Sequence, residues 1–595
     1  MKAHASPIRD YGLIGDGRTG ALVARDGCID WLCLPDLDSP SVFAALLDAE
    51  RGGRFELHPE EPHEIRRRYL PGTNVLETTF TTAHGVVRVT DAMALPGGAL
   101  APLREVARRV EGLAGRVPMR WRVEPRFGYA CTPTGIEWRG RIPVATAGGQ
   151  ALAICSWSAG DPKIEDAAVS APFEAREGTR ALLVLAAAHQ EPLVFPGREQ
   201  VEARLDLTID FWRRWSAGLV YRGPWREAVE RSALALKLLV FAPSGAIAAA
   251  PTTSLPEALG GERNWDYRFS WIRDSSFTLD ALLQLGCHAE AHSFFWWFMH
   301  ATALTRPRLQ VFYRLDGGAH APEQVLPLAG YRGSRPVRIG NGAAGQLQLD
   351  TFGQLLDAVH VYASRGYPIA RDIGAGLAAV ADLVCAKWRE PDAGIWEVRM
   401  APQHFTHSKM MCWVALDRAI RLARSGHLPA RGVVPWEREA AHIRQFIEQH
   451  CWSERQQSYV RHAGTDELDA SLLLMTVMRY DDPTGPRLAR TVEAVRAHLG
   501  HGPLLYRYTG QDGLAGAEGV FLCCSFWLVE ALALSGRGDE AARLMESLLA
   551  MANDVGLYAE EQDPASGEFL GNFPQGLVHL ALIRAAGALA DGVSS

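Results

Sequence analysis

Long apolar runs are missing from this sequence. None of its 595 residues lies in a stretch of roughly 18 consecutive apolar residues, the length that a membrane-spanning helix needs. The opening residues, MKAHASPIRDYG, also lack the apolar core of a secretory signal peptide. We therefore expect no membrane partner, and we expect the protein to reside in the cytoplasm.

Cysteine motifs are missing too, although the chain has ten cysteines. Apart from the neighbours Cys523 and Cys524 they are scattered, and none shows the C-x-x-C spacing of a redox or zinc site. Scattered free thiols are typical of a reducing cytoplasm. The sequence thus predicts no bound metal and no cofactor, and it leaves catalysis to oxygen and nitrogen groups.

An excess of positive charge is the third feature that is missing. Lys and Arg number 61 against 68 Asp and Glu, which gives a formal net charge of −7. Such a surface attracts neither a nucleic acid nor an anionic membrane, so we expect neither as a partner. Core-forming material is plentiful, because 48% of the residues are hydrophobic and 22% are charged. This length and composition predict two or three folded units.

The chain changes character near residue 222. Before that point, short β-rich runs alternate with turn signals, as in VVRVTDAMAL after Gly85 and in ALLVLAAA further on. After it, the apolar residues recur at helical spacing. We predict an antiparallel β-sandwich over residues 1–222 and a helical domain over residues 223–595.

Twelve helical patterns occur in the second part of the chain. They lie near residues 225–240, 274–286, 289–304, 349–365, 370–388, 408–423, 436–451, 468–478, 486–499, 523–536, 538–551 and 575–590. Twelve helices suggest an (α/α)6 toroid with six inner and six outer helices. A helical solenoid would give a similar number, but the fixed repeat period of a solenoid is missing.

The loops of such a toroid are where a substrate would bind. We expect each inner helix to end in a loop over one mouth of the barrel, and that mouth to be concave. The helix-poor stretches are 243–273, 305–348, 389–407 and 501–520, and the candidate functional residues are sought there.

Arg273 and Asp274 are adjacent in NWDYRFSWIRDSS, a segment dense in aromatic and charged residues just before a helical pattern. One interpretation is a capped helix with a surface ion pair. The other is a polar clamp for vicinal sugar hydroxyls, since Arg supplies a rigid fork of donors and Asp supplies acceptors. Spacing alone does not decide between the two.

Glu397 follows Trp396 in GIWEVR, between two helical patterns. A carboxyl held against an indole loses hydration, which raises its pKa and suits it to general acid catalysis near neutral pH. The alternative is a surface glutamate beside a half-buried tryptophan. The motif by itself is evenly balanced between these interpretations.

Glu560 and Glu561 form a tandem in LYAEEQDPASGEFLGNFPQG, ahead of a turn at Asp563 and Pro564. Paired carboxylates are commonly a solvated face. In an otherwise apolar region they also fit a loop at the barrel mouth, where Glu560 would deprotonate a water and Glu561 would assist or bind a hydroxyl.

Two weaker groups complete the candidates. His407 and Lys409, in HFTHSK, lack the spacing of an H-E-x-x-H zinc site. They would bind the leaving sugar or a phosphate, or line the start of a helix. Asp512 and Glu518 lie on a Gly-rich run, where each is either a plain loop residue or a polar group of the site.

Taken in order, these motifs resemble glycoside hydrolase family 15, which comprises the glucoamylases and the bacterial and archaeal trehalase-like enzymes. The resemblance covers nearly the whole chain and includes PTTSLPEALGGERNWDYRFSWIRDSSFTLDALLQLG, GNGAAGQLQLDTFGQ and AEEQDPASGEFLGNFPQGLVHLALI. The opening DYGLIGDGRTGALVARDGCIDWLCLPDLDSPSVF is similar to the β-domain that precedes the barrel in the trehalase-like branch.

The resemblance implies hydrolysis with inversion at the anomeric carbon by two carboxyl groups. The general acid of the family follows a tryptophan, and that position here is Glu397. The general base is the first glutamate of a short [SA]-E-[QE] motif, which corresponds to Glu560, because Ala559 precedes it and Glu561 follows it.

The resemblance also implies a set of sugar-binding residues. Arg273 and Asp274 match the pair that holds the non-reducing glucose, with Tyr267 beside it. The chain departs from the family at Phe352 and Gln354, where Tyr and Glu are more usual, a change that concerns hydrogen bonding near the barrel mouth. The expected substrate-binding residues are Tyr267, Arg273, Asp274, Trp396, His407, Lys409, Arg507, Glu518 and Glu561.

We therefore predict an inverting, exo-acting α-glucoside hydrolase that releases β-glucose from the non-reducing end. Trehalose is slightly favoured over malto- and isomalto-oligosaccharides. Two alternatives remain open: an inverting phosphorylase, in which phosphate replaces the water, and a non-catalytic sugar-binding protein. The expected partner is a small sugar or an oligosaccharide, and the sequence leaves open whether the chain forms a homo-oligomer.

Overall fold

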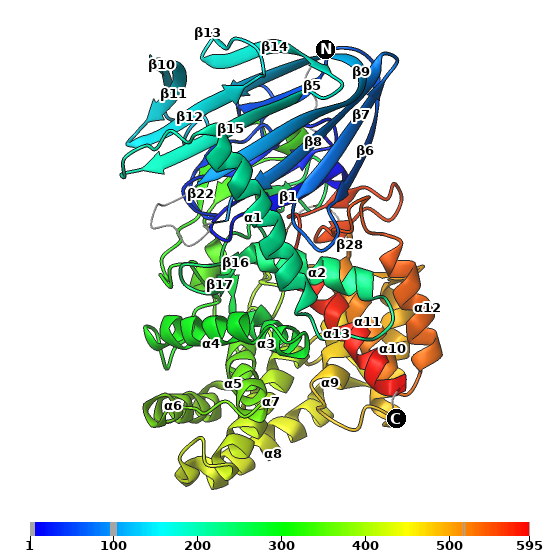
Figure 1. Cartoon of the computed structure of the whole chain (residues 1–595). Helices are drawn as coiled ribbons and strands as arrows, with labels where there is room; N and C mark the ends of the chain where they lie inside the picture. The colour runs from blue at the N-terminus through cyan, green and yellow to red at the C-terminus, as the bar shows by residue number, and fades with distance from the viewer. Residues whose placement is uncertain (1–5, 96–103, 515, 517, 594–595) are drawn as a thin grey trace.

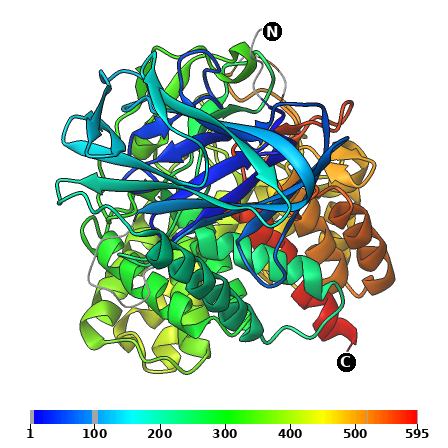
Figure 2. The ribbon, with the colours of Figure 1, turned by 45° about the horizontal axis from the view of Figure 1, so that its top comes forward.

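The computed structural model describes residues 6–95, 104–514, 516 and 518–593. Antiparallel strands form its N-terminal part and helices form its C-terminal part, as the sequence predicts. Figure 1 shows the sheets at one end of the molecule and the helices at the other, with short hairpins between them. Seen from the sheet end in Figure 2, the helices lie beneath and around the strands.

Within the described residues, the N-terminal part has fifteen strands in one hydrogen-bonded arrangement. They are β1 (Tyr11–Gly15), β2 (Gly20–Ala24), β3 (Ile29–Cys33), β4 (Ser41–Phe43), β5 (Arg54–Pro59), β6 (His63–Tyr69), β7 (Leu76–Thr82), β8 (Gly85–Met93), β9 (Glu105–Glu124), β10 (Gly135–Arg139), β11 (Ile142–Ala147), β12 (Gln150–Trp157), β13 (Lys163–Glu165), β14 (Ala168–Arg176) and β15 (Arg180–His189).

The strand β9 bends and belongs to both sheets of the sandwich. Its first half pairs with β8 and β15, and its second half pairs with β5 and β14. The bend lies at Gly112 and Gly115. A Cβ atom on Gly112 would lie 1.9 Å from the carbonyl oxygen of Arg176, and Gly115 has a φ of +65°. Glycine is therefore required at the bend, which joins two sheets that share one core.

The helix α1 (Arg198–Ala217) is absent from the helices predicted above. Its apolar residues Val201, Leu205, Ile209 and Trp212 recur at helical spacing, and they are buried against the sheets. Charged side chains fill the opposite face, so the segment has a polar average composition. We propose that the division at residue 222 leaves α1 with the sandwich.

Twelve further helices follow within the described part of the chain, and each corresponds to one of the predicted patterns. They are α2 (Arg226–Leu239), α3 (Ser275–Gln284), α4 (His288–Ala303), α5 (Asp350–Ser364), α6 (Arg371–Lys387), α7 (Thr406–Arg424), α8 (Val433–His450), α9 (Leu474–Val477), α10 (Pro486–Leu499), α11 (Leu522–Leu534), α12 (Gly538–Leu549) and α13 (Gly576–Val593).

These helices form a closed double ring. The odd-numbered helices from α3 to α13 contact one another in order, and α13 contacts α3, which closes the inner ring. The even-numbered helices pack outside it. Residues 522–532 of the inner helix α11 are all buried, whereas the outer helix α12 buries one face through Ala541, Met545 and Leu548. The predicted (α/α)6 barrel is confirmed.

The long loops precede the inner helices, whereas the sequence analysis expects them to follow. They contain short strands: β16 (Val240–Phe241), β17 (Ala246–Ile247), β18 (Thr253–Pro256), β19 (Asn264–Asp266), β20 (Ser270–Trp271), β21 (Phe312–Tyr313), β22 (Gln324–Leu326), β23 (Val337–Ile339), β24 (Trp452–Ser453), β25 (Ser458–Tyr459), β26 (Gly500–His501), β27 (Leu504–Leu505), β28 (Val520–Phe521), β29 (Glu561–Gln562) and β30 (Phe569–Leu570). The loops therefore lead into the N-termini of the inner helices. Since a helix N-terminus carries partial positive charge, this mouth favours carboxylates.

The sandwich packs directly on these loops. One hydrophobic cluster extends from the sheets to barrel residues such as Val555 and Phe573. The indole Nε1 of Trp31 donates a 2.8 Å hydrogen bond to the carbonyl of Pro251. The guanidinium of Arg268 donates a 2.6 Å bond to the hydroxyl of Tyr129. The N-terminal domain thus supports the loops that surround the barrel mouth.

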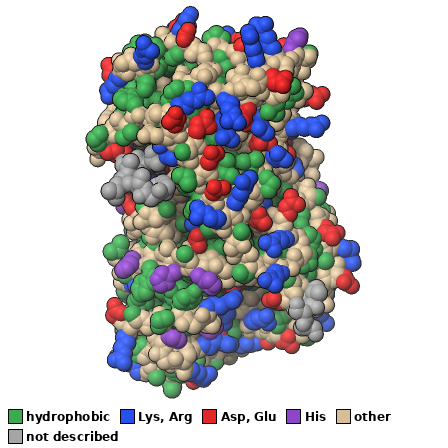
Figure 3. All heavy atoms as spheres, in the orientation of Figure 1, with side chains coloured by type: hydrophobic (Ala, Val, Ile, Leu, Met, Phe, Trp, Pro, Cys, Tyr) green, Lys and Arg blue, Asp and Glu red, His purple; other side chains and the backbone are tan. Residues whose placement is uncertain are grey.

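The surface carries no segregated charge on the face that Figure 3 shows, where acidic and basic side chains are interspersed. Among the helices of the described residues, none combines the length and the apolar character needed to cross a bilayer. All ten cysteines lie within the described residues and are free thiols, as predicted.

Candidate active site

Three loop segments meet at the barrel mouth. The first contains β19, β20 and the 3-10 turn Ile272–Asp274 just before α3, the second is the turn at residues 393–399 before α7, and the third carries Glu560 before α13. Contacts from Trp271 and Arg273 join the first segment to Glu397 on the second. Segments far apart in the sequence therefore form one site.

Arg273 and Asp274 form a buried ion pair. Arg273 Nε donates a 2.9 Å hydrogen bond to Asp274 Oδ1, and the two residues are only 6% and 8% exposed. The Asp274 side chain makes no capping bond to α3, although it stands at the N-cap position. Burial raises the pKa of the Asp274 carboxyl, and the Arg273 guanidinium opposes the rise. The alternative of a cap with a surface ion pair does not describe this arrangement.

Glu397 is held in a tight turn. Its backbone is left-handed, with a φ of +58°, and its N–H donates a 3.2 Å bond to the carbonyl of Gly394. A left-handed backbone is uncommon for a residue with a long side chain, and such strain is concentrated at functional sites. The Glu397 carboxyl accepts a 2.7 Å bond from Trp271 Nε1 and lies 3.6 Å from Arg273 Nη1.

The environment of Glu397 keeps its proton available. Burial raises the pKa of the Glu397 carboxyl, while the charge of Arg273 and the hydrogen bond from Trp271 limit the rise. The side chain is nevertheless 15% exposed, so a ligand can reach it. A carboxyl with a raised pKa and access to a ligand is suited to donate a proton.

The Trp396 indole hydrogen-bonds to Asp469. Its Nε1 donates bonds of 2.9 and 3.1 Å to the two carboxylate oxygens of Asp469. Its ring lies 5.5 Å from the Arg507 guanidinium. The indole that hydrogen-bonds to the Glu397 carboxyl is that of Trp271, which lies on another loop.

Glu560 is buried with one oxygen free. Its side chain is 1% exposed, and Oε2 accepts a 3.3 Å hydrogen bond from the backbone N–H of Asn572. The Oε1 atom has no hydrogen-bond partner among the described residues. Gly571 makes room for the carboxyl, since a Cβ at that position would lie 2.5 Å from Glu560 Oε2. An unpartnered carboxylate oxygen in a buried site is available to a water or a sugar hydroxyl.

A second buried carboxylate acts on Glu560. Burial raises the pKa of Glu560 to about 8, the negative charge of Glu257 adds to the rise, and Arg507 opposes it. Glu257 is itself 2% exposed, and its Oε2 accepts a 2.9 Å bond from Arg507 Nη2. Glu257 and Arg507 therefore set the electrostatic environment of Glu560.

Arg507 links three carboxylates. Besides Glu257, its guanidinium donates to Glu518, with Nε at 3.1 Å, and lies 3.7 Å from Glu561. Glu561 also accepts a 2.8 Å bond from the N–H of Gly519. Oxygens of Glu257, Glu518 and Glu561 lie within 4.8 Å of one another, a spacing that could hold a metal ion. Arg507 already supplies positive charge there.

Tyr267 lies within electrostatic reach of both glutamates. Its ring packs edge-on against Trp271, with centroids 5.0 Å apart. Burial raises the pKa of the Tyr267 hydroxyl well above its usual value, and the charges of Glu560, Glu257 and Glu397 add to the rise. The hydroxyl of Tyr267 therefore stands near both carboxyls that the sequence singled out.

The sequence comparisons agree with this geometry. Residues 223–587 match the profile of glycosyl hydrolases family 15, and residues 1–146 match that of the trehalase-like N-terminal domain. The chain belongs to glycosyl hydrolases family 15. It is accordingly a glycoside hydrolase, and the catalytic-domain match includes all three site segments.

Full-length relatives share both domains. The trehalase of Mycolicibacterium smegmatis is 39% identical over 97% of this chain and 90% of that protein. The trehalase of Thermoplasma volcanium is 35% identical over 98% of this chain and 94% of that protein. Among solved structures, a bacterial glucoamylase complexed with acarbose covers 99% of this chain and 96% of its own, with a TM-score of 0.71 and 12% identity. That likeness establishes the glucoamylase fold.

His407 lies close enough to Arg273 for the guanidinium charge to act on its ring. It is 2% exposed at the start of α7, and neither ring nitrogen has a partner among the described residues. Burial lowers the pKa of His407 to about 3, and Arg273 adds to the effect. The imidazole is therefore neutral and offers both a donor and an acceptor.

Asp350 is a further buried acid, on which the charges of Arg273 and Glu397 act. It is fully buried at the start of α5, and both carboxylate oxygens lack a partner within the described part of the chain. Burial raises the pKa of Asp350 to about 7, and the nearby charge of Asp392 adds to the rise. The carboxyl is protonated through the mildly acidic range.

Lys409 does not join the other site residues. Its ammonium donates bonds of 2.6 Å to the carbonyl of Trp388 and 2.5 Å to that of Glu390. These carbonyls lie at the cap of α6 and just after it, where a cation satisfies backbone acceptors and complements the helix dipole. Lys409 thus holds α6 against α7, and its ammonium is already engaged.

Two residues of the site are missing from the sequence prediction. Trp271 is one of many tryptophans in the second half, and nothing in its motif indicates that it reaches Glu397. Glu257 stands in the motif PTTSLPEALG, but its contact with Arg507 joins residues 250 positions apart. Both residues lie in the part of the chain that matches the family profile, and that match is the sequence signal that could have pointed to them.

Proposed function

We propose that the protein hydrolyses α,α-trehalose, with inversion at the anomeric carbon that is attacked. The convergence of two differently held carboxyls supports this most. Glu397 is oriented by Trp271 and Arg273, whereas Glu560 keeps a buried, unpartnered Oε1 atom. Inverting glycosidases use one carboxyl to protonate the leaving oxygen and one carboxylate to deprotonate a water.

Glu397 is the general acid of this proposal. Burial raises the pKa of its carboxyl, which favours the protonated form, and the bond from Trp271 fixes the direction of the carboxyl. As the glycosidic bond lengthens, the proton passes to the bridging oxygen and the leaving sugar departs as an alcohol. The sugar left behind develops oxocarbenium character, which nearby carboxylates stabilise.

Glu560 is the general base. Its Oε1 atom is free to accept a proton from a water on the opposite face of the sugar, while Oε2 is held by Asn572. Glu561 also has an Oε1 atom without a hydrogen-bond partner among the described residues, but that oxygen lies 3.7 Å from the Arg507 guanidinium, and Oε2 accepts a bond from Gly519. For such a water to fit, the carboxyls of Glu397 and Glu560 should lie roughly 6.5–9.5 Å apart.

The burial of the expected glucose-binding residues supports exo-action. Arg273, Asp274 and His407 are each more than nine-tenths buried, as suits groups that enclose the end of a sugar chain. A terminal glucose would offer vicinal hydroxyls to the fork of Arg273 and the acceptors of Asp274. The leaving sugar would then face Trp396, Arg507 and the carboxylates that Arg507 binds.

Trehalose as substrate rests on the relatives and on the domain order. Relatives named trehalase align with both domains of this chain, and the first domain matches the trehalase-like profile.

One experiment tests the substrate and the stereochemistry together. The purified protein is incubated with trehalose, maltose, isomaltose and soluble starch, and the first products are followed by NMR. With inversion, trehalose yields equal amounts of α- and β-glucose at the outset, because one ring inverts and the other keeps its anomer. Retention would yield only α-glucose and would contradict the mechanism. Fastest turnover of maltose or starch would contradict the substrate.

A parallel incubation with inorganic phosphate separates hydrolysis from phosphorolysis. In a phosphorylase the phosphate attacks the anomeric carbon, and the product is glucose 1-phosphate. The free Oε1 atom of Glu560 favours water as the nucleophile. We expect glucose as the sole product in both incubations, and release of glucose 1-phosphate would overturn the hydrolytic proposal.

A further inference from the structure

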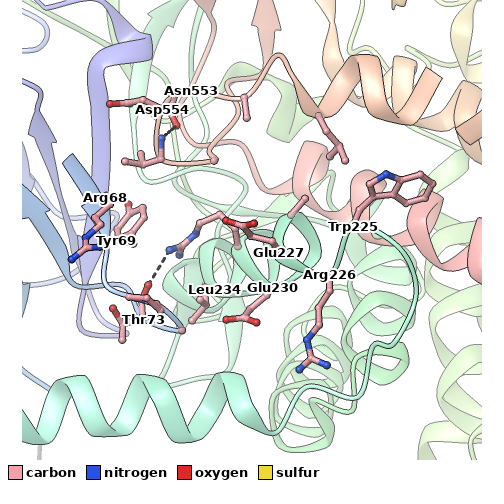
Figure 4. Close-up of a pocket in the computed structure, with 18 of the residues that line it drawn as sticks. Arg68, Tyr69, Thr73, Trp225, Arg226, Glu227, Glu230, Leu234, Asn553 and Asp554 are labelled. Atoms are coloured by element: carbon pink, nitrogen blue, oxygen red, sulfur yellow. Dashed lines mark hydrogen bonds between the residues drawn. The ribbon is translucent and has the colours of Figure 1, made fainter. Parts of the chain in front are cut away.

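A cavity of about 980 Å³ lies apart from the site described above (Figure 4). Its wall combines the turn between β6 and β7, the start of α2 and the loop after α12. Sites for small molecules typically enclose roughly 300–1,000 Å³, so this cavity is large enough for one. Among its described lining residues, none belongs to the set proposed to bind or cleave the substrate.

Left-handed backbone shapes this cavity at three positions. Gly72 and Gly556 have φ values of +70° and +77°, which glycine adopts readily. Trp225 also has a left-handed backbone, with a φ of +59°, and a bulky residue is rarely found there. Figure 4 shows Trp225 at one end of the cavity, with Tyr69 at the other. The strained turn at the start of α2 thus presents an indole to the cavity.

Arg231 lies on the wall without a carboxylate partner. Its guanidinium lies 4.0 Å from the centroid of the Tyr69 ring and donates a 2.9 Å bond to the carbonyl of Thr73. Its Nε atom is buried and has no hydrogen-bond partner among the described residues. Burial lowers the pKa of Arg231 to about 10, so the group stays charged near neutral pH. One donor of this guanidinium is therefore unused.

The unpaired charges of the cavity balance one another. Within the described residues, Glu227, Glu230 and Arg226 form no ion pair with any side chain, and Arg231 forms none with a carboxylate. Figure 4 shows the two glutamates between the ends of the cavity. Two carboxylates and two guanidiniums that lack an ion-pair partner carry no net charge together.

The remaining charged side chains of the wall are already paired. Arg68 lies 2.9 Å from Glu77, and Asp554 lies 2.6 Å from Arg67. They add no free charge. An anionic ligand would meet the two unpaired glutamates, and an apolar ligand would not use the hydrogen-bonding groups of the wall. The lining instead suits a neutral molecule with many hydroxyl groups.

We propose that this cavity is a second, non-catalytic site for a neutral mono- or disaccharide. The Trp225 indole offers a flat apolar face to the C–H face of a sugar ring. Glu227 and Glu230 accept hydrogen bonds from hydroxyls, and Arg231 donates one through its unused N–H. The site is independent of the reaction proposed above, because its lining residues differ.

Fluorine NMR of the 5-fluorotryptophan-labelled protein tests this site directly. The Trp225 resonance is assigned as the one that disappears in Trp225→Phe, and in Trp225→Gly, where glycine fits the left-handed backbone. Glucose is the probe, since the protein does not consume it. We expect the Trp225 resonance to shift saturably with glucose, while that of Trp138, 47% exposed on β10, stays fixed.

The variant Glu230→Gln provides the second measurement. It removes a carboxylate without breaking any described ion pair, and hydrogen bonds to charged groups are the stronger ones. We expect it to weaken glucose binding at the Trp225 resonance about tenfold. Three outcomes would overturn the proposal: no shift with glucose, unchanged affinity in Glu230→Gln, or a saturable shift with inorganic phosphate instead. None of these measurements depends on catalysis, so a failure of this proposal is distinguishable from a failure of the proposed reaction.

Discussion

The indole Nε1 of Trp271 donates a 2.7 Å hydrogen bond to Oε1 of Glu397, across 126 positions of the chain. Arg273, on the same segment, approaches the same oxygen to 3.6 Å. The carboxyl is therefore aimed by a neutral donor and held near a cation. The neutral donor fixes the direction of the carboxyl, and burial raises the pKa of Glu397 although both Trp271 and Arg273 oppose the rise.

Trp271→Phe removes that hydrogen bond and keeps most of the ring packing. Since such a bond contributes about 1 kcal/mol, we expect kcat/KM to fall roughly fivefold. The N–H favours the carboxylate form, so its loss raises the pKa of Glu397 and makes the deficit smaller at alkaline pH. A pH profile of kcat/KM measures both effects. A uniform deficit at every pH, or an equal deficit in the exposed control Trp138→Phe, would contradict this prediction.

Glu397→Gln tests the general acid. We expect hydrolysis of trehalose to fall by about 10²–10⁴-fold, with the thermal midpoint unchanged. Hydrolysis of α-glucosyl fluoride, whose leaving group needs little protonation, should fall much less. Steady-state rates on the two substrates give the comparison, with Glu390→Gln, in a partly exposed surface pair with Lys387, as the control. If the rates on trehalose and on α-glucosyl fluoride fell equally, Glu397 would not be the general acid.

Glu560→Gln tests the general base and should behave differently. Water must be deprotonated for either substrate, so we expect losses of about 10²–10⁴-fold on trehalose and on α-glucosyl fluoride alike. Glu568→Gln, on the same loop and partly exposed, is the matched control and should retain wild-type rates. If Glu560→Gln kept most of its activity on trehalose, another group would be the base.

Glu257→Gln removes the charge that adds to the raised pKa of Glu560. The Glu560 pKa should then fall, because a neutral amide does not repel the carboxylate. Since Glu560 works deprotonated, kcat/KM on the acidic side of the profile should rise relative to wild type, about tenfold for each unit of pKa lowering. The alkaline side, governed by Glu397, should not change. If kcat/KM on the acidic side were the same in Glu257→Gln and in the exposed control Glu262→Gln, Glu257 would not act on the pKa of Glu560.

Asp350→Asn should alter the pH dependence of stability. The folded-state pKa of Asp350, about 7, lies above its ordinary value of 3.8, so the folded protein binds more protons between these pH values. Wild-type stability therefore falls as pH rises through that window, by up to roughly 4 kcal/mol from this group. Thermal midpoints measured from pH 4 to about pH 8 should diverge in favour of Asp350→Asn. The exposed control Asp372→Asn should follow wild type across the range.

Much of the fold was predictable because the barrel repeats one physical pattern. Inner helices such as α11 are apolar on all sides and outer helices such as α12 are apolar on one face, so both produce clear periodic signals. The helix α1 was not predicted, because its buried stripe is narrow and many of its other residues are charged. The bend of β9 depends on which strands lie beside Gly112, which a linear pattern does not contain.

The site was predictable only in part. Ordered motifs located Arg273, Glu397 and Glu560, since each stands in a segment with a recognisable sequence. Which indole meets Glu397 depends on the distance between loops, and that distance follows from packing alone. The same holds for Glu257, whose effect on Glu560 passes through space from another loop.

The contacts between the ends of the chain have a consequence for biosynthesis. Arg9 donates a 3.0 Å bond to the carbonyl of Gly567, and Asn553 donates a 2.8 Å bond to the carbonyl of Tyr11. Synthesis runs from the N-terminus to the C-terminus, so Tyr11 leaves the ribosome well before Asn553 and Gly567. These contacts between the two domains therefore form only after the segment near Glu560 has been synthesised.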